Sequence, residues 1–358
     1  MKTDCSTPTS APSKRLFLAA CASLMLVTAG SAVAADPIEI KVSHYLPPQH
    51  TINKELNRWA EELNIKSQGR LKVSVFPSGQ MGPINRQFDL ARTGVADAAF
   101  LLHGALPGRF PLTELAQLPY VFNPESGSTM KKALNNADAS AILTGLDGDL
   151  AKEHAGTHIL YMIASPTISL MFDRPGVRSP ADMRGMRVRH NGPASAKMIE
   201  AWGATPAAVA PVELSDALAK GTVNGMTLTY EGARAFQVGP AVKSVAEVNA
   251  YAITFALVMN DKKYRSLPAD LRKLIDDSTG VEAARRIGGE FDKAEAAGRQ
   301  YLVDSKADIY VPTAEDQKAF RNPVLPLVNE ALEKGAADGL PSRKFYDTLR
   351  NRVNGLKL

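Results

Sequence analysis

The chain has 358 residues, which is enough for two domains, and its 45% hydrophobic and 22% charged content is ordinary for a globular protein. The net charge of +5 comes without a long basic run, which argues against a nucleic-acid-binding protein. Both cysteines, Cys5 and Cys21, lie near the N-terminus. Beyond them no thiol is available, which excludes disulfides, thiolate metal sites and cysteine nucleophiles in the rest of the chain.

Residues 1–34 are predicted to be a signal peptide. A basic pair precedes an apolar run at 16–30, and a small-residue cleavage motif ends at Ala34, so cleavage is expected before Ala35. Processing as a lipoprotein at Cys21 is the alternative, but the apolar run continues past this cysteine. No later stretch is apolar over about 18 residues, so we expect a soluble protein of the periplasm.

Alternating strands and helices are predicted through the first part of the chain. Apolar residues recur every second position in strands and every 3.6 positions in helices. In chain order these are a strand at 38–45, a helix at 53–65, a strand at 71–76, a helix at 86–93, a strand at 95–100, helical residues at 130–152 and a strand at 157–163. The β-α-β order with short turns predicts a parallel strand pair and the first layer of an α/β domain.

A second α/β domain is predicted after the chain crosses over at 167–172. It comprises strands at 186–190, 205–210, 223–227 and 245–250, helices at 194–202 and 212–220, and a strand at 253–260 that leads back to the first domain. A helical run from 267 to 303 follows, in which Gly288-Gly289 can introduce a bend. Helices at 317–336 and 342–353 end the chain.

Arg189 is the leading candidate for a binding residue. It ends the strand at 186–190, and in an open α/β sheet ligands bind beyond the carboxyl ends of the strands. Its planar, permanently charged guanidinium can hold a carboxylate through two parallel hydrogen bonds, which lysine cannot reproduce. The alternative is a surface arginine paired with an acidic neighbour.

Several segments, in one order over roughly residues 38–300, resemble the solute-binding proteins of TRAP transporters, the DctP-type family. They are Ser67-Gln68-Gly69-Arg70, Phe76-Pro77-Ser78-Gly79-Gln80-Met81-Gly82, the segment Gly94 to Asp97, Leu118-Pro119-Tyr120, the pattern Asp182, Gly185, Arg187 and Arg189, and residues 211–225, in which Asn224 replaces the usual aspartate.

The resemblance implies a two-lobed periplasmic binding protein of the type II-like kind, with two α/β domains joined by hinge strands and a long helix spanning both lobes. It assigns residues 35–165 and 255–298 to lobe I and residues 166–254 and 299–358 to lobe II. In the family's motif the last arginine, here Arg189, clamps the carboxylate of the ligand. The implied partners are a small carboxylate and the membrane permease subunits of a TRAP transporter, and we expect a monomer.

Further binding residues are predicted from their positions after strand ends that face the cleft. They are Tyr45, Gln80, His103, Asn191, Thr229, Tyr230 and either Phe172 or Phe255, and for each of them core packing or loop capping is the alternative. Relative to the sugar-acid binders of the family, this chain lacks a glutamate at 101–103, a second arginine at Ser169 and an asparagine near Leu228. A pocket without these polar groups leaves sugar hydroxyls unpaired, so an apolar or aromatic 2-hydroxy or 2-oxo monocarboxylate is the favoured ligand.

Other functions remain open at this point. A C4-dicarboxylate ligand is the alternative within the family, and the ligand subunit of a sensor is another. An exported α/β hydrolase or lyase is the alternative of a different class. The sequence has no G-x-S-x-G elbow, phosphate-binding loop or dinucleotide fingerprint, and His154 and His158 are not part of an H-E-x-x-H motif, so we expect no catalytic residues, metal or cofactor.

Overall fold

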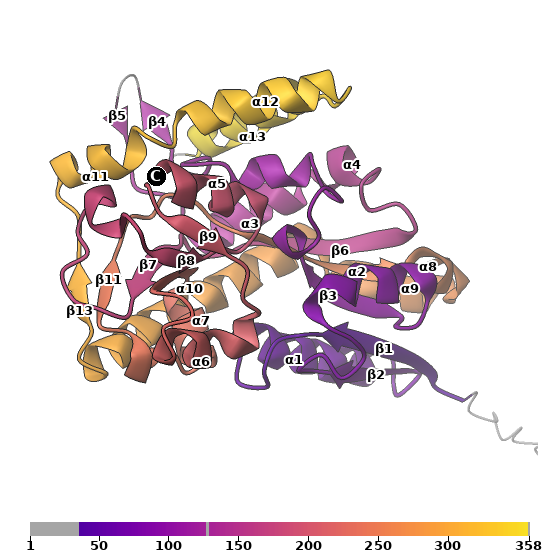
Figure 1. The fold of residues 1–358 in the computed structure, drawn as a ribbon. Helices are drawn as coiled ribbons and strands as arrows, with labels where there is room; N and C mark the ends of the chain where they lie inside the picture. The colour runs from indigo at the N-terminus through magenta and orange to yellow at the C-terminus, as the bar shows by residue number, and fades with distance from the viewer. Residues whose placement is uncertain (1–35, 127–128, 357–358) are drawn as a thin grey trace, which may run out of the picture. The chain divides into compact units, whose positions relative to one another are not determined.

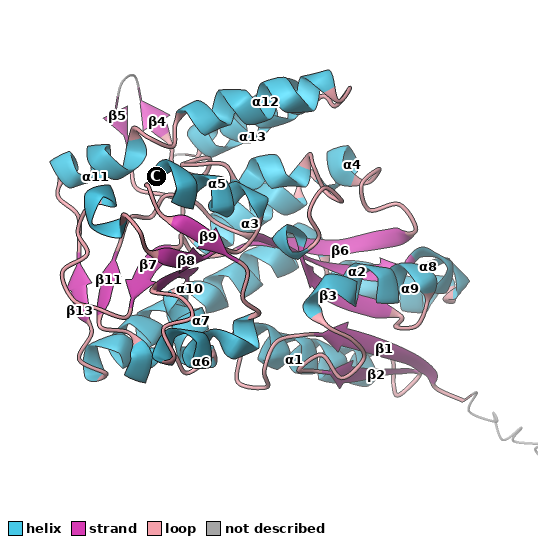
Figure 2. Cartoon of the chain, in the orientation of Figure 1, coloured by secondary structure: helices cyan, strands magenta, loops and turns pink. Residues whose placement is uncertain are grey.

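The strands of the protein form two main sheets. The computed structural model describes residues 36–126 and 129–356, so the predicted signal peptide at 1–34 lies outside the described residues (Figure 1). The first sheet has the order β2-β1-β3-β12-β6 and the second the order β13-β11-β7-β10-β8-β9. Figure 2 shows the two sheets as separate groups of strands with helices packed around each.

The first sheet contains the predicted parallel pair. Its strands are β1 (Ile38–His44), β2 (Leu71–Phe76), β3 (Ala98–Leu102), β6 (Thr157–Ala164) and β12 (Thr254–Asn260). β1 pairs in parallel with β2, as predicted, and also with β3. β12 lies antiparallel between β3 and β6, so a strand from late in the chain completes this sheet.

The second sheet carries the strand that ends at Arg189. Its strands are β7 (Ser169–Phe172), β8 (Arg187–Arg189), β9 (Thr205–Ala207), β10 (Gly225–Leu228), β11 (Ser244–Ala246) and β13 (Asp308–Tyr310). β8 is parallel to both of its neighbours, β9 and β10. The carboxyl ends of these three strands therefore lie at one edge of the sheet.

The helices have the following bounds: α1 Thr51–Lys66, α2 Gln87–Thr93, α3 Asn136–Thr144, α4 Asp147–Leu150, α5 Pro193–Ala201, α6 Leu214–Ala219, α7 Tyr230–Ala235, α8 Asp261–Ser266, α9 Ala269–Ser278, α10 Gly280–Asp304, α11 Ala314–Arg321, α12 Pro326–Ala337 and α13 Ser342–Gly355. A short hairpin, β4 (Glu125–Ser126) with β5 (Thr129–Met130), completes the elements. No helix of the described residues is long and apolar enough to cross a membrane.

Helix α10 is the long helix that spans both halves of the fold, as predicted. It packs against α3, which lies on β6 of the first sheet, and against α7, which follows β10 of the second. The helical run predicted from 267 to 303 breaks at Gly280, whose φ is +74°, and α10 is continuous through Gly288-Gly289, where a bend stays a prediction. Gly288 serves close packing, since a Cβ at this position would lie 2.4 Å from the carbonyl oxygen of Asn136.

The chain crosses between the two sheets twice, and the two crossing segments lie side by side. The backbone N–H of Ser165 donates to Ile253 O (2.9 Å), and that of Ile168 donates to Tyr251 O (2.8 Å). The predicted lobe boundaries and hinges near residues 165 and 255 stay predictions. Residues 299–358 were assigned to lobe II, but only β13 of this segment joins the second sheet, whereas α12 and α13 pack in the same hydrophobic cluster as β3, β6 and β12.

Candidate functional site

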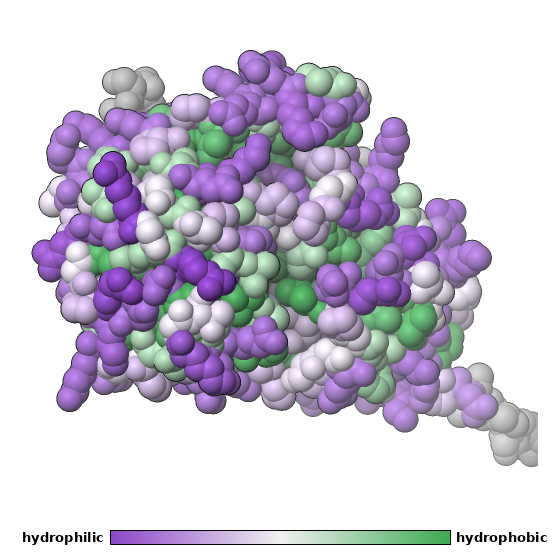
Figure 3. Space-filling view, viewed as in Figure 1, coloured by the Kyte–Doolittle hydropathy of each residue, from purple (hydrophilic) through white to green (hydrophobic). Residues whose placement is uncertain are grey.

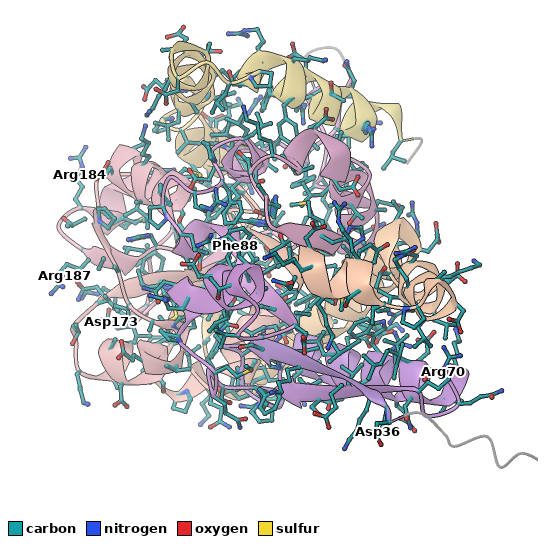
Figure 4. The ribbon with its side chains drawn as sticks, turned by 90° about the vertical axis from the view of Figure 1, so that its right-hand side faces the viewer. Asp36, Arg70, Phe88, Asp173, Arg184 and Arg187 are labelled. Carbon is teal, nitrogen blue, oxygen red and sulfur yellow. The ribbon has the colours of Figure 1, made fainter. Side chains whose placement is uncertain are left out.

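Arg189 is buried at the carboxyl end of β8. Its exposed fraction is 3%, because β8 lies between β9 and β10. Arg187, two residues earlier on the same strand, is exposed, and Figure 4 shows its side chain at the edge of the molecule. The strand thus directs one arginine to solvent and the other to the interior.

The guanidinium of Arg189 is held by neutral oxygen atoms. Nε donates to Val209 O (3.2 Å), and Nη1 donates to Thr227 O (3.2 Å) and to Oδ1 of Asn191. Among the residues described by the structure, no carboxylate forms a salt bridge with Arg189, and Nη2 donates to no protein acceptor. Burial lowers the pKa of Arg189 to about 10, which leaves it cationic at neutral pH. A buried cation that forms no salt bridge with a carboxylate of the described residues favours an anionic ligand.

Asn191 fixes the orientation of this guanidinium. Its Oδ1 accepts from Arg189, while its Nδ2 donates to the Thr227 hydroxyl (2.8 Å) and to the Tyr251 hydroxyl (3.2 Å). The Thr227 hydroxyl in turn donates to the carbonyl oxygen of Arg189 (3.0 Å). This closed network limits the movement of the guanidinium, as a preorganised anion receptor requires.

Arg189 and Asn191 line the same cavity, which lies where the carboxyl ends of β8 and β10 meet. Most of its lining is apolar or aromatic and comes from both halves of the fold, from the chain crossings and from α10. The lining residues are Tyr45, Leu46, His50, Leu102, Ser165, Ile168, Arg189, Asn191, Pro211, Leu228, Thr229, Glu231, Gly232, Phe236, Ile253, Phe255 and Phe291. Figure 3 shows the outer face of the protein, where hydrophobic residues gather towards the centre and hydrophilic residues surround them.

Glu231 and His50 bring a second polar group to the cavity. Oε1 of Glu231 accepts from both the backbone N–H and the hydroxyl of Thr51, each at 2.9 Å. Oε2 of Glu231 lies 3.2 Å from Nε2 of His50. The ring of His50 packs edge-on against Phe291, so one side of the histidine is apolar and the other faces the carboxylate.

Half of the predicted site residues line this cavity. Arg189, Tyr45, Asn191 and Thr229 do so, and so does Phe255, the alternative to Phe172.

Gln80, His103, Phe172 and Tyr230 do not line the cavity. Gln80 is exposed in the turn after β2, and Phe172 is fully buried in the second sheet. His103 is fully buried, with its Nε2 3.1 Å from Nε2 of His154. The hydroxyl of Tyr230 donates to Glu247 (2.7 Å), which is not a cavity residue.

Several cavity residues were not predicted. His50 and Glu231 belong to the loop before α1 and to α7, and both follow predicted strand ends by a few residues, so a wider window after each strand end would have included them. Phe236 lies just past α7, and Phe291 is on α10. An inward-facing phenylalanine in a helix has the same spacing whether it lines a cavity or a core, so the sequence carries no signal for Phe291.

The described residues contain no group of three or more histidine, cysteine or acidic side chains that could hold a metal ion.

Residues 42–335 match the family model DctP, described as bacterial extracellular solute-binding protein, family 7. The chain belongs to this family. Its members are solute-binding proteins, as the sequence segments and the cavity had indicated.

Individual relatives are similar over most of their length. The C4-dicarboxylate-binding periplasmic protein DctP of Rhodobacter capsulatus is 24% identical over 325 residues, covering 87% of this chain and 91% of the relative. A TRAP solute-binding protein from Rhodoferax ferrireducens T118, solved with copurified benzoate, is 25% identical with a TM-score of 0.81, covering 88% of this chain and 97% of that one.

A TRAP solute-binding protein of a marine metagenome, specific for aromatic acid ligands and solved with metahydroxyphenylacetate, is 24% identical with a TM-score of 0.82. The match covers 88% of this chain and 98% of that chain. These likenesses confirm the predicted two-lobed α/β fold of a periplasmic binding protein.

Proposed function

We propose that this solute-binding protein captures an organic acid with one carboxylate and that Arg189 holds this carboxylate in the cavity. The observation that carries the proposal is the buried guanidinium of Arg189, which lines a largely apolar cavity. Within the described residues its hydrogen-bond partners are all neutral, and Nη2 has none. A ligand carboxylate would supply the missing counter-charge and two hydrogen-bond acceptors.

The apolar lining favours an aromatic or branched 2-hydroxy or 2-oxo acid. Leu102 and Leu228 line the cavity, and both belong to segments where the sugar-acid binders of the family carry polar residues. Phe236, Phe255 and Phe291 add aromatic surface. The relatives solved with benzoate and with metahydroxyphenylacetate support the same ligand class.

The protein would then act in the periplasm, after removal of residues 1–34, as a receptor and not as an enzyme. Closure of two lobes about the chain crossings would bury the ligand, and differential affinity for the closed form would drive the closure. The loaded form would deliver its ligand to the membrane subunits of a TRAP-type transporter. Co-purification with permease subunits encoded beside its gene tests this partner.

A thermal-shift screen of residues 35–358 tests the ligand class. Aromatic and branched 2-hydroxy and 2-oxo acids, C4-dicarboxylates, sugar acids and neutral sugars form the panel. A ligand at 100 times its Kd stabilises the folded protein by about 2.7 kcal/mol, which raises the Tm by a few degrees. A shift with monocarboxylates supports the proposal, a shift with C4-dicarboxylates alone favours the alternative ligand, and a shift with neutral sugars alone contradicts the role of Arg189.

Substitution of Arg189 tests the carboxylate contact. Arg189→Ala should weaken binding of the acid found in the screen by about 2 to 5 kcal/mol, or roughly 1.5 to 3.5 decades in Kd. Arg189→Lys should restore only part of the affinity, because lysine lacks the planar pair of donors. Arg187→Ala is the matched control from the same strand and should bind like the wild type. Wild-type affinity in the Arg189 variants would refute the assignment.

A further inference from the structure

We infer that Glu231, together with His50, makes the cavity selective for acids with a single carboxylate and provides an acceptor for a hydroxyl group of the ligand. This inference rests on the proposed function, because it assumes that Arg189 binds the first carboxylate. It assigns Glu231 a role in ligand specificity.

Two hydrogen bonds and one close contact favour the ionised form of the Glu231 side chain. The backbone N–H and the hydroxyl of Thr51 donate to Oε1. Nε2 of His50 lies 3.2 Å from Oε2, and it carries a hydrogen, because Nδ1 of His50 accepts the backbone N–H of Ile52 at 3.2 Å. A protonated carboxyl group would need an acceptor, and none of these three contacts provides one.

His50 does not cancel the charge of Glu231. A backbone N–H can only donate, so the contact with Ile52 leaves Nδ1 of His50 unprotonated and the imidazole neutral. Burial also lowers the pKa of His50. The Glu231–His50 pair therefore presents a net negative charge, and Glu231 itself is only 5% exposed.

The cavity thus contains one buried cation and one buried anion. Arg189, Glu231 and Tyr45 all line it. An acid whose first carboxylate binds Arg189 extends into the space that Glu231 also borders. A second carboxylate in that space would face a like charge in a site of low dielectric constant, where repulsion is strong.

A hydroxyl group is well suited to the same position. Each carboxylate oxygen has two lone pairs, and within the described residues Oε2 of Glu231 has one close polar neighbour, Nε2 of His50 at 3.2 Å. A ligand hydroxyl can donate to the remaining lone pair. An uncharged, apolar edge would also fit, without this additional bond.

Three aromatic acids of one ring size provide the test: benzoate, 3-hydroxybenzoate and isophthalate, which differ only in the group meta to the carboxylate. Calorimetric titration of residues 35–358 should give 3-hydroxybenzoate the lowest Kd, benzoate a Kd within about tenfold of it, and isophthalate a Kd at least about 100-fold higher than benzoate. Isophthalate binding within tenfold of benzoate would overturn the inference.

The Glu231→Gln variant removes the charge and keeps the size of the side chain. It should lower the Kd ratio of isophthalate to benzoate by at least about tenfold and remove the advantage of 3-hydroxybenzoate. An unchanged ratio in this variant would refute the role of Glu231. If the variant does not fold, the ranking of the three acids by the wild-type protein decides alone.

Glu295→Gln is the matched control. Glu295 accepts from the backbone N–H groups of Tyr230 and Glu231, at 2.8 and 2.9 Å, but it does not line the cavity. Its substitution replaces a neighbouring acidic side chain with the amide of the same size and should leave the Kd ratio unchanged. Failure of every carboxylate to bind the wild-type protein would instead overturn the proposed function, and with it this inference. Equal binding of benzoate and isophthalate, with loss of both in Arg189→Ala, would overturn the inference alone.

Discussion

The partners of Arg189 have a consequence for stability as well as for binding. Its buried charge is compensated only by Val209 O, Thr227 O and Asn191, which are neutral, so the ligand-free protein bears a desolvation cost. Binding sites commonly lower stability in this way. The residue that contributes most to binding should therefore contribute little to folding.

Arg189→Met should separate these two effects. We expect the variant to lose binding of the carboxylate ligand while its unfolding free energy stays within about 1 kcal/mol of the wild type or rises. Urea denaturation of the ligand-free proteins measures the free energy, and titration measures the binding. A loss of several kcal/mol in the ligand-free variant would show that Arg189 is instead a structural residue.

The pair His103 and His154 should make stability depend on pH. Burial lowers the pKa of His154 from 6.5 to about 4. Between these two pH values the unfolded chain binds a proton at His154 and the folded protein does not. This contribution to stability is fully present above pH 6.5 and is lost as the pH falls towards 4. Its slope is at most about 1.4 kcal/mol per pH unit.

His154→Phe provides the measurement. At pH 7.5 the variant should be less stable than the wild type, because it loses the contacts of His154 with His103 and with Leu150 O. The difference in unfolding free energy should narrow as the pH is lowered from 6.5 to 4, since only the wild type takes up the proton on unfolding. Phe88→Leu perturbs the same cluster without a titrating group and should show a difference that does not change with pH.

Among single residues, the sequence predicted those cavity residues whose position at the end of a strand is enough to place them in the site. Arg189, Asn191 and Thr229 directly follow or end strands whose carboxyl ends meet at one edge, so their place could be inferred. His103 follows β3 in the same way, but its side chain turns into the core towards His154. Which way a side chain turns after a strand depends on the neighbours that the fold supplies, and a single sequence does not contain them.

Among the elements, α10 packs so closely against a neighbouring backbone that only glycine fits at the contact. A Cβ at Gly298 would lie 2.1 Å from the carbonyl oxygen of Tyr230, and the backbone of α7 cannot move away without moving Glu231 and Thr229 in the cavity. Gly289, on the same helix, has no atom within 4 Å of a built Cβ. The two glycines therefore differ in their environment and not in their helical conformation.

These glycines allow a paired substitution. Gly298→Ala should destabilise the protein by about 1 to 3 kcal/mol and weaken ligand binding, because the added methyl group pushes α7 away from α10. Gly289→Ala should instead stabilise it by about 0.5 to 1 kcal/mol, through the higher helix propensity of alanine. Urea denaturation of both variants measures the effects. A similar change in both would contradict the role of close packing at Gly298.

The order of the helices and strands was largely predictable from the sequence, whereas the points at which long helical segments are interrupted were not. Strand β2 has the predicted bounds, and α1 and α13 lie close to theirs, because their apolar periodicity is regular. The helix predicted at 317–336 is two helices, α11 and α12, with the second beginning at Pro326. The Gly288-Gly289 pair was expected to bend α10, and Gly288 also allows contact with the backbone of Asn136. Such a contact depends on neighbours that tertiary packing supplies, so the sequence did not reveal it.

For the whole molecule, the two sheets are interlocked by the path of the chain. β12 returns to the first sheet after the second sheet has been almost completed, α10 packs against both halves, and α12 and α13 return to the first sheet. We therefore expect residues 35–358 to unfold in one cooperative transition, with a calorimetric enthalpy equal to the van't Hoff enthalpy. Differential scanning calorimetry measures both. Two resolved transitions would show that the halves fold independently.

The position of β12 also determines when the protein can fold as the chain emerges from a ribosome or a membrane pore. Until residues 254–260 have emerged, β3 keeps an unpaired edge and β6 has no partner in its sheet. The first two thirds of the chain therefore cannot complete either its core or the wall of the cavity that includes Phe255. A partly emerged chain stays unfolded with exposed strand edges, a state that can still pass through a narrow channel and that chaperones must protect from aggregation.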